Sequence, residues 1–266
     1  MTQRNLKTMM KLWSGLVSNF CIVCVTRSGS YYPMEYICRT FDLAEGNEWF
    51  GRNKEADLSK PFELKQKRLP IDFNVNEDLL HDKDIQDRLR HLHNFPVPYC
   101  VKAMPPQFTN TVESVNIPVL EKIKFAQKIL RDFDLIYFIN EDKVSHFCYE
   151  ITSKLCSSKD YPRPREYSTY DPDLRVTPPP NSFTATLQDF YTFKTRDIFT
   201  EKVMEVFECP VITYKDFVKD QDKEMKKIAD YYDITPKKVD KIPIVLNPDY
   251  SNIFTNYKEI CKWFTT

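Results

Sequence analysis

Short apolar runs and longer amphipathic stretches follow one another along most of this chain. Short, mostly apolar runs at residues 22–25, 99–104, 134–139 and 209–214 predict buried strands. Between them, apolar residues recur every three or four positions, which is typical of helices that bury one face. Such helices are expected at residues 79–92, 117–133, 143–156, 183–207 and 222–232, with another starting near residue 256. Strands that alternate with helices predict an α/β fold with three layers and a mostly parallel sheet.

The 266 residues contain no internal repeat and no linker long enough to divide them, so we expect a single domain over residues 1–266. Residues 161–182 hold many prolines and charges, and this composition predicts a long loop or lid. Ligands of parallel sheets bind at the carboxyl ends of the strands. The segments that follow the first three predicted strands are therefore expected to meet at one edge of the sheet.

The composition is typical of a globular protein from a reducing compartment. With 42% hydrophobic and 29% charged residues, the chain can bury a sizeable core. It carries 38 Lys and Arg against 38 Asp and Glu, which gives no electrostatic case for a nucleic-acid or membrane partner. The 8 cysteines are scattered among apolar segments, which argues against a disulfide framework and for a reducing compartment.

Neither a metal site nor a membrane segment is predicted. Cys21 and Cys24 form a C-x-x-C pair inside the first predicted strand, without a second pair at zinc-finger spacing. The apolar segment 12–25 is broken by polar residues and is shorter than the roughly 20 residues that span a bilayer. We expect a short helix that leads into the first strand, and hence a cytoplasmic protein. The basic start leaves a signal peptide as the alternative, although its cleavage would remove that strand.

The stretch that carries the most chemistry is Arg27-Ser28-Gly29-Ser30, directly after the first predicted strand. A helix is expected to follow from Pro33 to Arg39. Gly29 would let the backbone approach an oxyanion, the two serines would donate hydrogen bonds, and the helix start would add N–H groups. The Lys-Ser/Thr ending of a nucleoside-triphosphatase loop is missing, so the hydroxyl that holds Mg²⁺ there is not supplied. The sequence predicts a cradle for phosphate or sulfate.

These residues resemble the 5′-phosphosulfate loop of sulfotransferases that use 3′-phosphoadenosine 5′-phosphosulfate (PAPS). The likeness is closest to bacterial trehalose 2-sulfotransferase-like proteins, whose first unit runs strand, Arg-Ser-Gly-Ser-Thr, helix, and an acidic-aromatic box. The box corresponds here to Glu48-Trp49-Phe50. Residues 101–104, 211–217, 225–234 and 256–260 are similar, in order, to later segments of the family. The resemblance implies a P-loop-like sulfotransferase topology and the transfer of a sulfuryl group from PAPS to a carbohydrate-like hydroxyl.

The resemblance also implies roles for individual residues. Glu48 would take the proton of the acceptor hydroxyl, and Arg27 would stabilise the transferring sulfuryl group, so both are candidate catalytic residues. An ordinary solvated Glu and a surface Arg at a strand end are the alternatives. The donor would be bound by Arg27, Ser28, Gly29, Ser30, Tyr31, Tyr32, Lys102, Asn140 and Tyr149. Lys102 could instead be a lysine that extends from a strand edge to solvent. His146, next to Phe147, is more often a packed or surface histidine than a base.

The chain departs from the family at the donor's 3′-phosphate. Asn140 stands where the family has an Arg, and Tyr149 stands where it has a Ser. Tyr31 also replaces the usual Thr of the loop. Asn cannot make the bidentate charged contact of Arg, so the donor would be held by other cations such as Lys143, Arg163 or Arg165, or would not be PAPS.

A sulfotransferase-fold binding protein without catalysis is the alternative reading of this departure. A phosphoryl transferase such as a nucleotide kinase is a more distant alternative, because the P-loop Lys is missing. The acceptor is not encoded in a recognisable motif, and a homo-oligomer stays open.

Overall fold

A single parallel sheet organises the computed structural model, which describes residues 19–26, 28–47, 82–95, 97–109, 116–155, 180–244 and 249–265. Within these ranges the sheet has five strands in the order β2-β3-β1-β4-β5. Every paired neighbour runs parallel. The strands are β1 (Phe20–Val23), β2 (Ala44–Asn47), β3 (Tyr99–Ala103), β4 (Asp134–Ile139) and β5 (Val211–Thr213).

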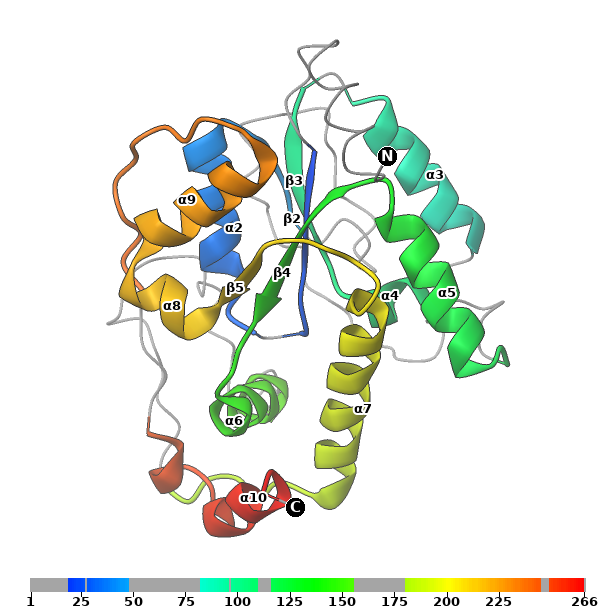
Figure 1. The fold of residues 1–266 in the computed structure, drawn as a ribbon. Coiled ribbons are helices and arrows are strands. Elements are labelled where there is room, and N and C mark those ends of the chain that lie inside the picture. The colour runs from blue at the N-terminus through cyan, green and yellow to red at the C-terminus, as the bar shows by residue number, and fades with distance from the viewer. Residues whose placement is uncertain are drawn as a thin grey trace.

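Helices connect the strands and cover the sheet (Figure 1). They are α2 (Tyr31–Phe41), α3 (Asp82–His93), α4 (Pro105–Thr109), α5 (Val119–Leu130), α6 (Lys143–Leu155), α7 (Leu187–Met204), α8 (Tyr214–Lys219), α9 (Gln221–Tyr232), the 3₁₀ helix η2 (Tyr250–Asn252) and α10 (Tyr257–Trp263). The expected α/β class with a parallel sheet is thus confirmed.

The alternation of side chains along β1 shows why the molecule has three layers. Cys21 and Val23 face a core that includes residues of α3, α4, α5 and α7. Phe20 and Ile22 face the opposite core, which includes residues of α2, α8 and α9. All four side chains are fully buried. Because successive strand residues point to opposite faces, a central strand with helices on both faces must be apolar throughout.

The helix that follows β1 lies on one face of the sheet, and the helices that follow its neighbour β3 lie on the other. The helix that follows β1, α2, contributes to the second core, whereas α4 and α5 after β3 and α7 after β4 contribute to the first. Ligands of open α/β sheets bind at the carboxyl ends of the strands, at the point where such a reversal occurs. The loop that follows β1 starts at this reversal.

A third apolar cluster lies beyond the carboxyl end of β4, where α6 and α10 are found (Figure 1). Phe147 of α6 stacks edge-on against Phe190 and Phe193 of α7, with ring centroids 6.3 and 5.6 Å apart. Tyr250, Phe254 and residues of α10 complete this cluster. It anchors α6 next to α7, beyond the carboxyl end of β4.

Several element boundaries differ from the sequence-based expectation. Helix α2 starts at Tyr31, two residues before Pro33, and ends at Phe41. Strand β2 was not predicted, because its sequence Ala-Glu-Gly-Asn has no apolar run. Helix α4 was not predicted either, since Pro105-Pro106 suggests a break, although proline fits well in the first turn of a helix. Within the described residues, no helix has the length and apolar character that a bilayer crossing requires.

Candidate functional site

The loop between β1 and α2 contains a glycine that no other residue could replace without strain. Gly29 has a φ of 85°, in the left-handed region. A Cβ added to Gly29 would lie 2.8 Å from Cε2 of Tyr214, which follows β5. The glycine is therefore required both by its backbone conformation and by the aromatic ring that packs against it. The loop is held close to the carboxyl end of β5.

Ser28 presents a buried hydroxyl in the same loop. The residue is 1% exposed, and its amide donates to the carbonyl of Val25 at 3.2 Å. Its Oγ has no hydrogen-bond partner among the described residues. A buried hydroxyl without a partner costs on the order of 1–3 kcal/mol, so such groups usually have a ligand, an ion or water to bind. This atom is the clearest sign of a binding site in the loop.

The start of α2 has the electrostatic character of an anion site. Ser30 precedes the helix and makes no side-chain cap hydrogen bond to it. Instead, its Oγ lies 3.2 Å from the Sγ of Cys24, which donates to it. The first turn of α2 contains no acidic side chain that would offset the positive end of the helix dipole. An anion next to Ser28 and Gly29 would face this end.

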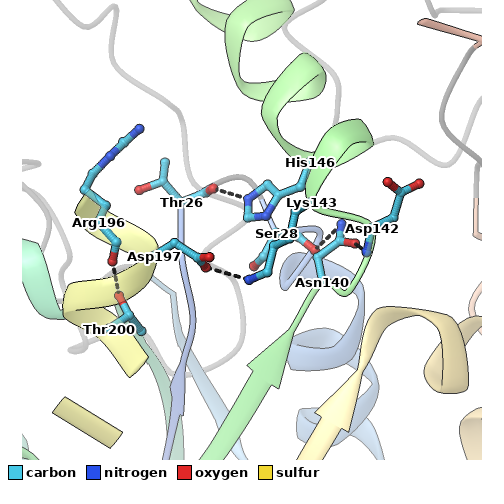
Figure 2. A network of polar contacts seen from close by, with 9 residues as sticks. All are labelled: Thr26, Ser28, Asn140, Asp142, Lys143, His146, Arg196, Asp197 and Thr200. Carbon is cyan, nitrogen blue, oxygen red and sulfur yellow. Dashed lines mark hydrogen bonds and ion pairs between the residues drawn. The ribbon is translucent and has the colours of Figure 1, made fainter. Parts of the chain in front are cut away.

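Asn140 connects the end of β4 to the loop. It is buried, with 6% of its surface exposed. Its Nδ2 donates to the carbonyl of Ser28 at 3.5 Å, and its Oδ1 accepts from the amide of Asp142 at 3.2 Å (Figure 2). Both ends of the side-chain amide are thus engaged within the protein. Asn140 therefore joins the end of β4 to the loop that follows β1.

His146 of α6 holds the loop at a second point. Its Nε2 lies 2.7 Å from the carbonyl oxygen of Thr26 (Figure 2). A carbonyl oxygen can only accept, so Nε2 carries the proton. The ring is 1% exposed and stacks edge-on against Phe193 at 4.9 Å between centroids. Burial lowers the pKa of His146, while the hydrogen bond to Thr26 opposes this shift.

Two ion pairs fix α6 to α7 on either side of His146. Lys143 Nζ lies 2.6 Å from Asp197 Oδ1, and Arg196 pairs with Glu150. The carboxylates are buried, with side chains 7% and 2% exposed, whereas the two cations are partly exposed. Lys143 was one of the cations expected to replace the missing Arg. Its ammonium group is bound to Asp197 in this structure.

Lys102 lies in a buried group of charges on the α2 face of the sheet. It is 7% exposed and alternates along β3 with Val101 and Ala103, which face the opposite core. Burial, with a smaller contribution from Glu35, raises the pKa of Glu45, and the positive charge of Lys102 acts against this shift. Lys102 therefore has a carboxylate in its electrostatic range on the neighbouring strand β2.

The structure brings together four of the residues predicted for the donor site: Ser28, Gly29, Ser30 and Asn140. Tyr31 and Tyr32 start α2 and are half-buried, with ring centroids 6.4 Å apart. Tyr149 is half-buried and packs against the third apolar cluster. Arg27 and Glu48 lie outside the described residues, as do Trp49, Phe50, Arg163 and Arg165.

Sequence reasoning missed the parts that His146 and Tyr214 play around the loop. Phe147 beside it favoured a packed or surface histidine over a base, but gave no sign of a contact with Thr26, 120 residues earlier. Tyr214 stands at the end of a predicted strand, and that position is the one signal that could have placed it at this edge.

The described part of the chain offers backbone N–H groups, a buried hydroxyl and a helix start, which together can bind a tetrahedral oxyanion. No cluster of three or more metal-ligating side chains occurs among these residues. A comparison of the chain with models of protein families and with curated proteins finds no match.

Proposed function

We propose that this protein transfers a sulfuryl group from PAPS to a hydroxyl of a carbohydrate-like acceptor. The observation that carries the proposal is the buried Oγ of Ser28, which has no partner among the described residues. It lies on a loop that joins the central strand β1 to the start of α2, with Gly29 in the left-handed conformation. From the resemblance of residues 27–30 to a 5′-phosphosulfate loop, we infer that the oxyanion is the donor's phosphosulfate. We assign the sheet to the P-loop-like sulfotransferase topology on the same grounds.

The reaction would proceed by in-line attack of the acceptor oxygen on the sulfur atom. Glu48 would take the proton of the acceptor hydroxyl as the new S–O bond forms. The bond between sulfur and the bridging oxygen would break, and adenosine 3′,5′-bisphosphate would leave. Arg27 and the N–H groups of the loop would stabilise the charge that develops on this oxygen. The sulfuryl group needs no metal for this transfer.

Binding and transfer assays on the full chain test the proposal. We expect micromolar binding of adenosine 3′,5′-bisphosphate by calorimetry, and transfer of labelled sulfate from PAPS to at least one member of a sugar panel. Ser28→Ala should weaken binding by about tenfold, because a hydroxyl on a charged ligand contributes roughly 1.5 kcal/mol or more. Ser251→Ala, which changes an exposed serine in η2, serves as the control. A protein that neither binds the bisphosphate nor transfers sulfate would refute the proposal.

The second candidate is a sulfotransferase-like binding protein that does not catalyse transfer. Asn140 favours it, because its amide is engaged with Ser28 and Asp142 and supplies no positive charge. Arg27→Ala and Glu48→Gln separate the two candidates. In an enzyme, Arg27→Ala should abolish turnover, and Glu48→Gln should reduce turnover with nearly unchanged donor affinity. Bisphosphate binding without sulfate transfer to any acceptor would favour the binding protein.

A further inference from the structure

The two peptide groups on either side of Arg27 are both held by side chains from a single distant segment. The carbonyl of Thr26 accepts a hydrogen bond from His146, and the carbonyl of Ser28 accepts one from Asn140. Both donors belong to the end of β4 and the first turns of α6, more than 110 residues later in the chain. The hydrogen bonds therefore fix the path of the backbone immediately before and after residue 27.

The bond from His146 is the shorter of the two, at 2.7 Å against 3.5 Å from Asn140. The imidazole is enclosed by the loop, by α6 and by the ring of Phe193. Its other nitrogen, Nδ1, is buried and has no hydrogen-bond partner among the described residues. Since Nε2 is engaged with a carbonyl and the ring is 1% exposed, His146 is placed to orient the loop and not to exchange protons with an acceptor.

The helix that carries His146 is itself firmly attached. Lys143, three residues before it, pairs with Asp197, and Glu150, four residues after it, pairs with Arg196. Asp197 and Arg196 are neighbours on α7, which packs against the sheet. Charged pairs with buried carboxylates are costly to separate, so α6 has little freedom to move relative to α7. The hydrogen bond from the imidazole to Thr26 therefore holds the loop in a fixed position relative to α6 and α7.

We propose that His146 is a positioning residue of the anion-binding loop. Through the carbonyl of Thr26, it sets the direction in which the N–H groups of Gly29 and Ser30 face the donor's phosphosulfate. This inference rests on the proposed function for the identity of the anion. The hydrogen bond itself, and its effect on the loop, do not depend on that identity.

Calorimetry with adenosine 3′,5′-bisphosphate tests the proposal on the full chain. His146→Leu removes the donor, and we expect the Kd to rise about tenfold with the stoichiometry unchanged. His146→Gln has an amide N–H of similar reach and should return the Kd to within about threefold of the wild-type value. A merely structural role would lower the stoichiometry, through misfolded protein, and would leave the Kd of the remaining sites unchanged. His93→Gln, an exposed histidine of α3, is the control.

Hydrogen exchange of the loop amides gives a readout that needs no ligand. In His146→Leu the amide of Ser28, bonded to the carbonyl of Val25, should exchange at least fivefold faster, with unchanged exchange in α9. If this variant does not fold, His146→Asn, whose amide is too short to reach Thr26, takes its place. Unchanged Kd and unchanged loop exchange in a folded variant would overturn the inference. A wild-type protein that binds no bisphosphate, with faster loop exchange in the variant, would refute the proposed function but support the role of His146.

Discussion

The imidazole of His146 and the carbonyl of Thr26 form a 2.7 Å hydrogen bond that joins two segments 120 residues apart. This bond ties α6 to the loop that follows β1. On another side of the loop, the ring of Tyr214 packs against Gly29 from the end of β5. Asn140, at the end of β4, reaches the carbonyl of Ser28. The ends of β4 and β5 and the helix α6 therefore constrain the conformation of one short loop, as a preorganised anion site requires.

Gly29→Ala should destabilise the protein. A left-handed conformation costs an alanine roughly 1–2 kcal/mol, and its Cβ would also collide with Tyr214. We expect the free energy of unfolding in urea to fall by about 1–3 kcal/mol. The double variant Gly29→Ala/Tyr214→Ala removes the collision but keeps the backbone strain. If Gly29→Ala is as stable as the wild type, the conformation of the loop around residue 29 is not the one described here.

Asn140 variants should separate its two hydrogen bonds. Asn140→Ala loses both, and the free energy of unfolding should fall by about 1–3 kcal/mol. Asn140→Asp keeps an oxygen that can accept from the amide of Asp142 but cannot donate to Ser28. Chemical denaturation measures both variants at pH 8, where the new carboxylate is ionised. Equal stability of Asn140→Asp and wild type would show that the contact with Ser28 contributes nothing.

The segment that forms the loop could be predicted from the sequence, whereas the distant residues that contact the loop could not. A strand followed by Arg-Ser-Gly-Ser and a helix is a short-range pattern, and the structure has the strand, the loop with Gly29 and the helix in that order, with α2 beginning two residues earlier than predicted. The partners of the loop come from residues 140, 146 and 214. Their placement depends on the strand order, which periodicity along the chain does not encode.

The difference between local sequence patterns and tertiary contacts also explains which elements were predicted and which were missed. The strands β1, β3 and β4 are buried on both faces, so each was visible as an apolar run. Strand β2 pairs with β3 alone in the described sheet, and its four residues carry too few apolar side chains to be detected. Lys143 was one of several cations that could replace the family's Arg, and in the structure it forms an ion pair with Asp197, a tertiary contact across 54 residues. A single sequence gives no sign of such a pairing.

Removal of Arg196 should break an ion pair of a buried carboxylate. The side chain of Glu150 is only 2% exposed, so Arg196→Met should lower the free energy of unfolding by about 3–5 kcal/mol. Adding Glu150→Gln removes the uncompensated charge and should recover most of this loss. Lys202→Met, on the same helix, breaks an exposed pair with Glu205 and should cost less than about 1 kcal/mol. Equal losses for Arg196→Met and Lys202→Met in urea denaturation would contradict the assigned burial of Glu150.

The stability of the protein should depend on pH through His146. Burial is the largest influence on this imidazole, and it lowers the pKa of His146 below its usual value in the folded state. In the unfolded chain the imidazole takes up a proton near pH 6.5. Between that pH and the lower pKa of the folded state, the unfolded chain binds more protons than the folded one. Stability should therefore be fully present above about pH 7 and should be lost progressively as the pH falls below 6.5.

His146→Gln isolates this contribution, because glutamine keeps an N–H donor but does not titrate. Urea denaturation at several pH values from 5.5 to 8 should show a smaller loss of stability toward acid pH in the variant than in the wild type. Glu35 and Glu45, whose pKa values burial raises, act in the opposite direction, since they favour the folded state as they become protonated. Both proteins contain them, so they cancel in the difference. Parallel pH profiles for the two proteins would contradict this prediction. They would mean that His146 takes up a proton as readily in the folded state as in the unfolded chain, despite its packing against Phe193.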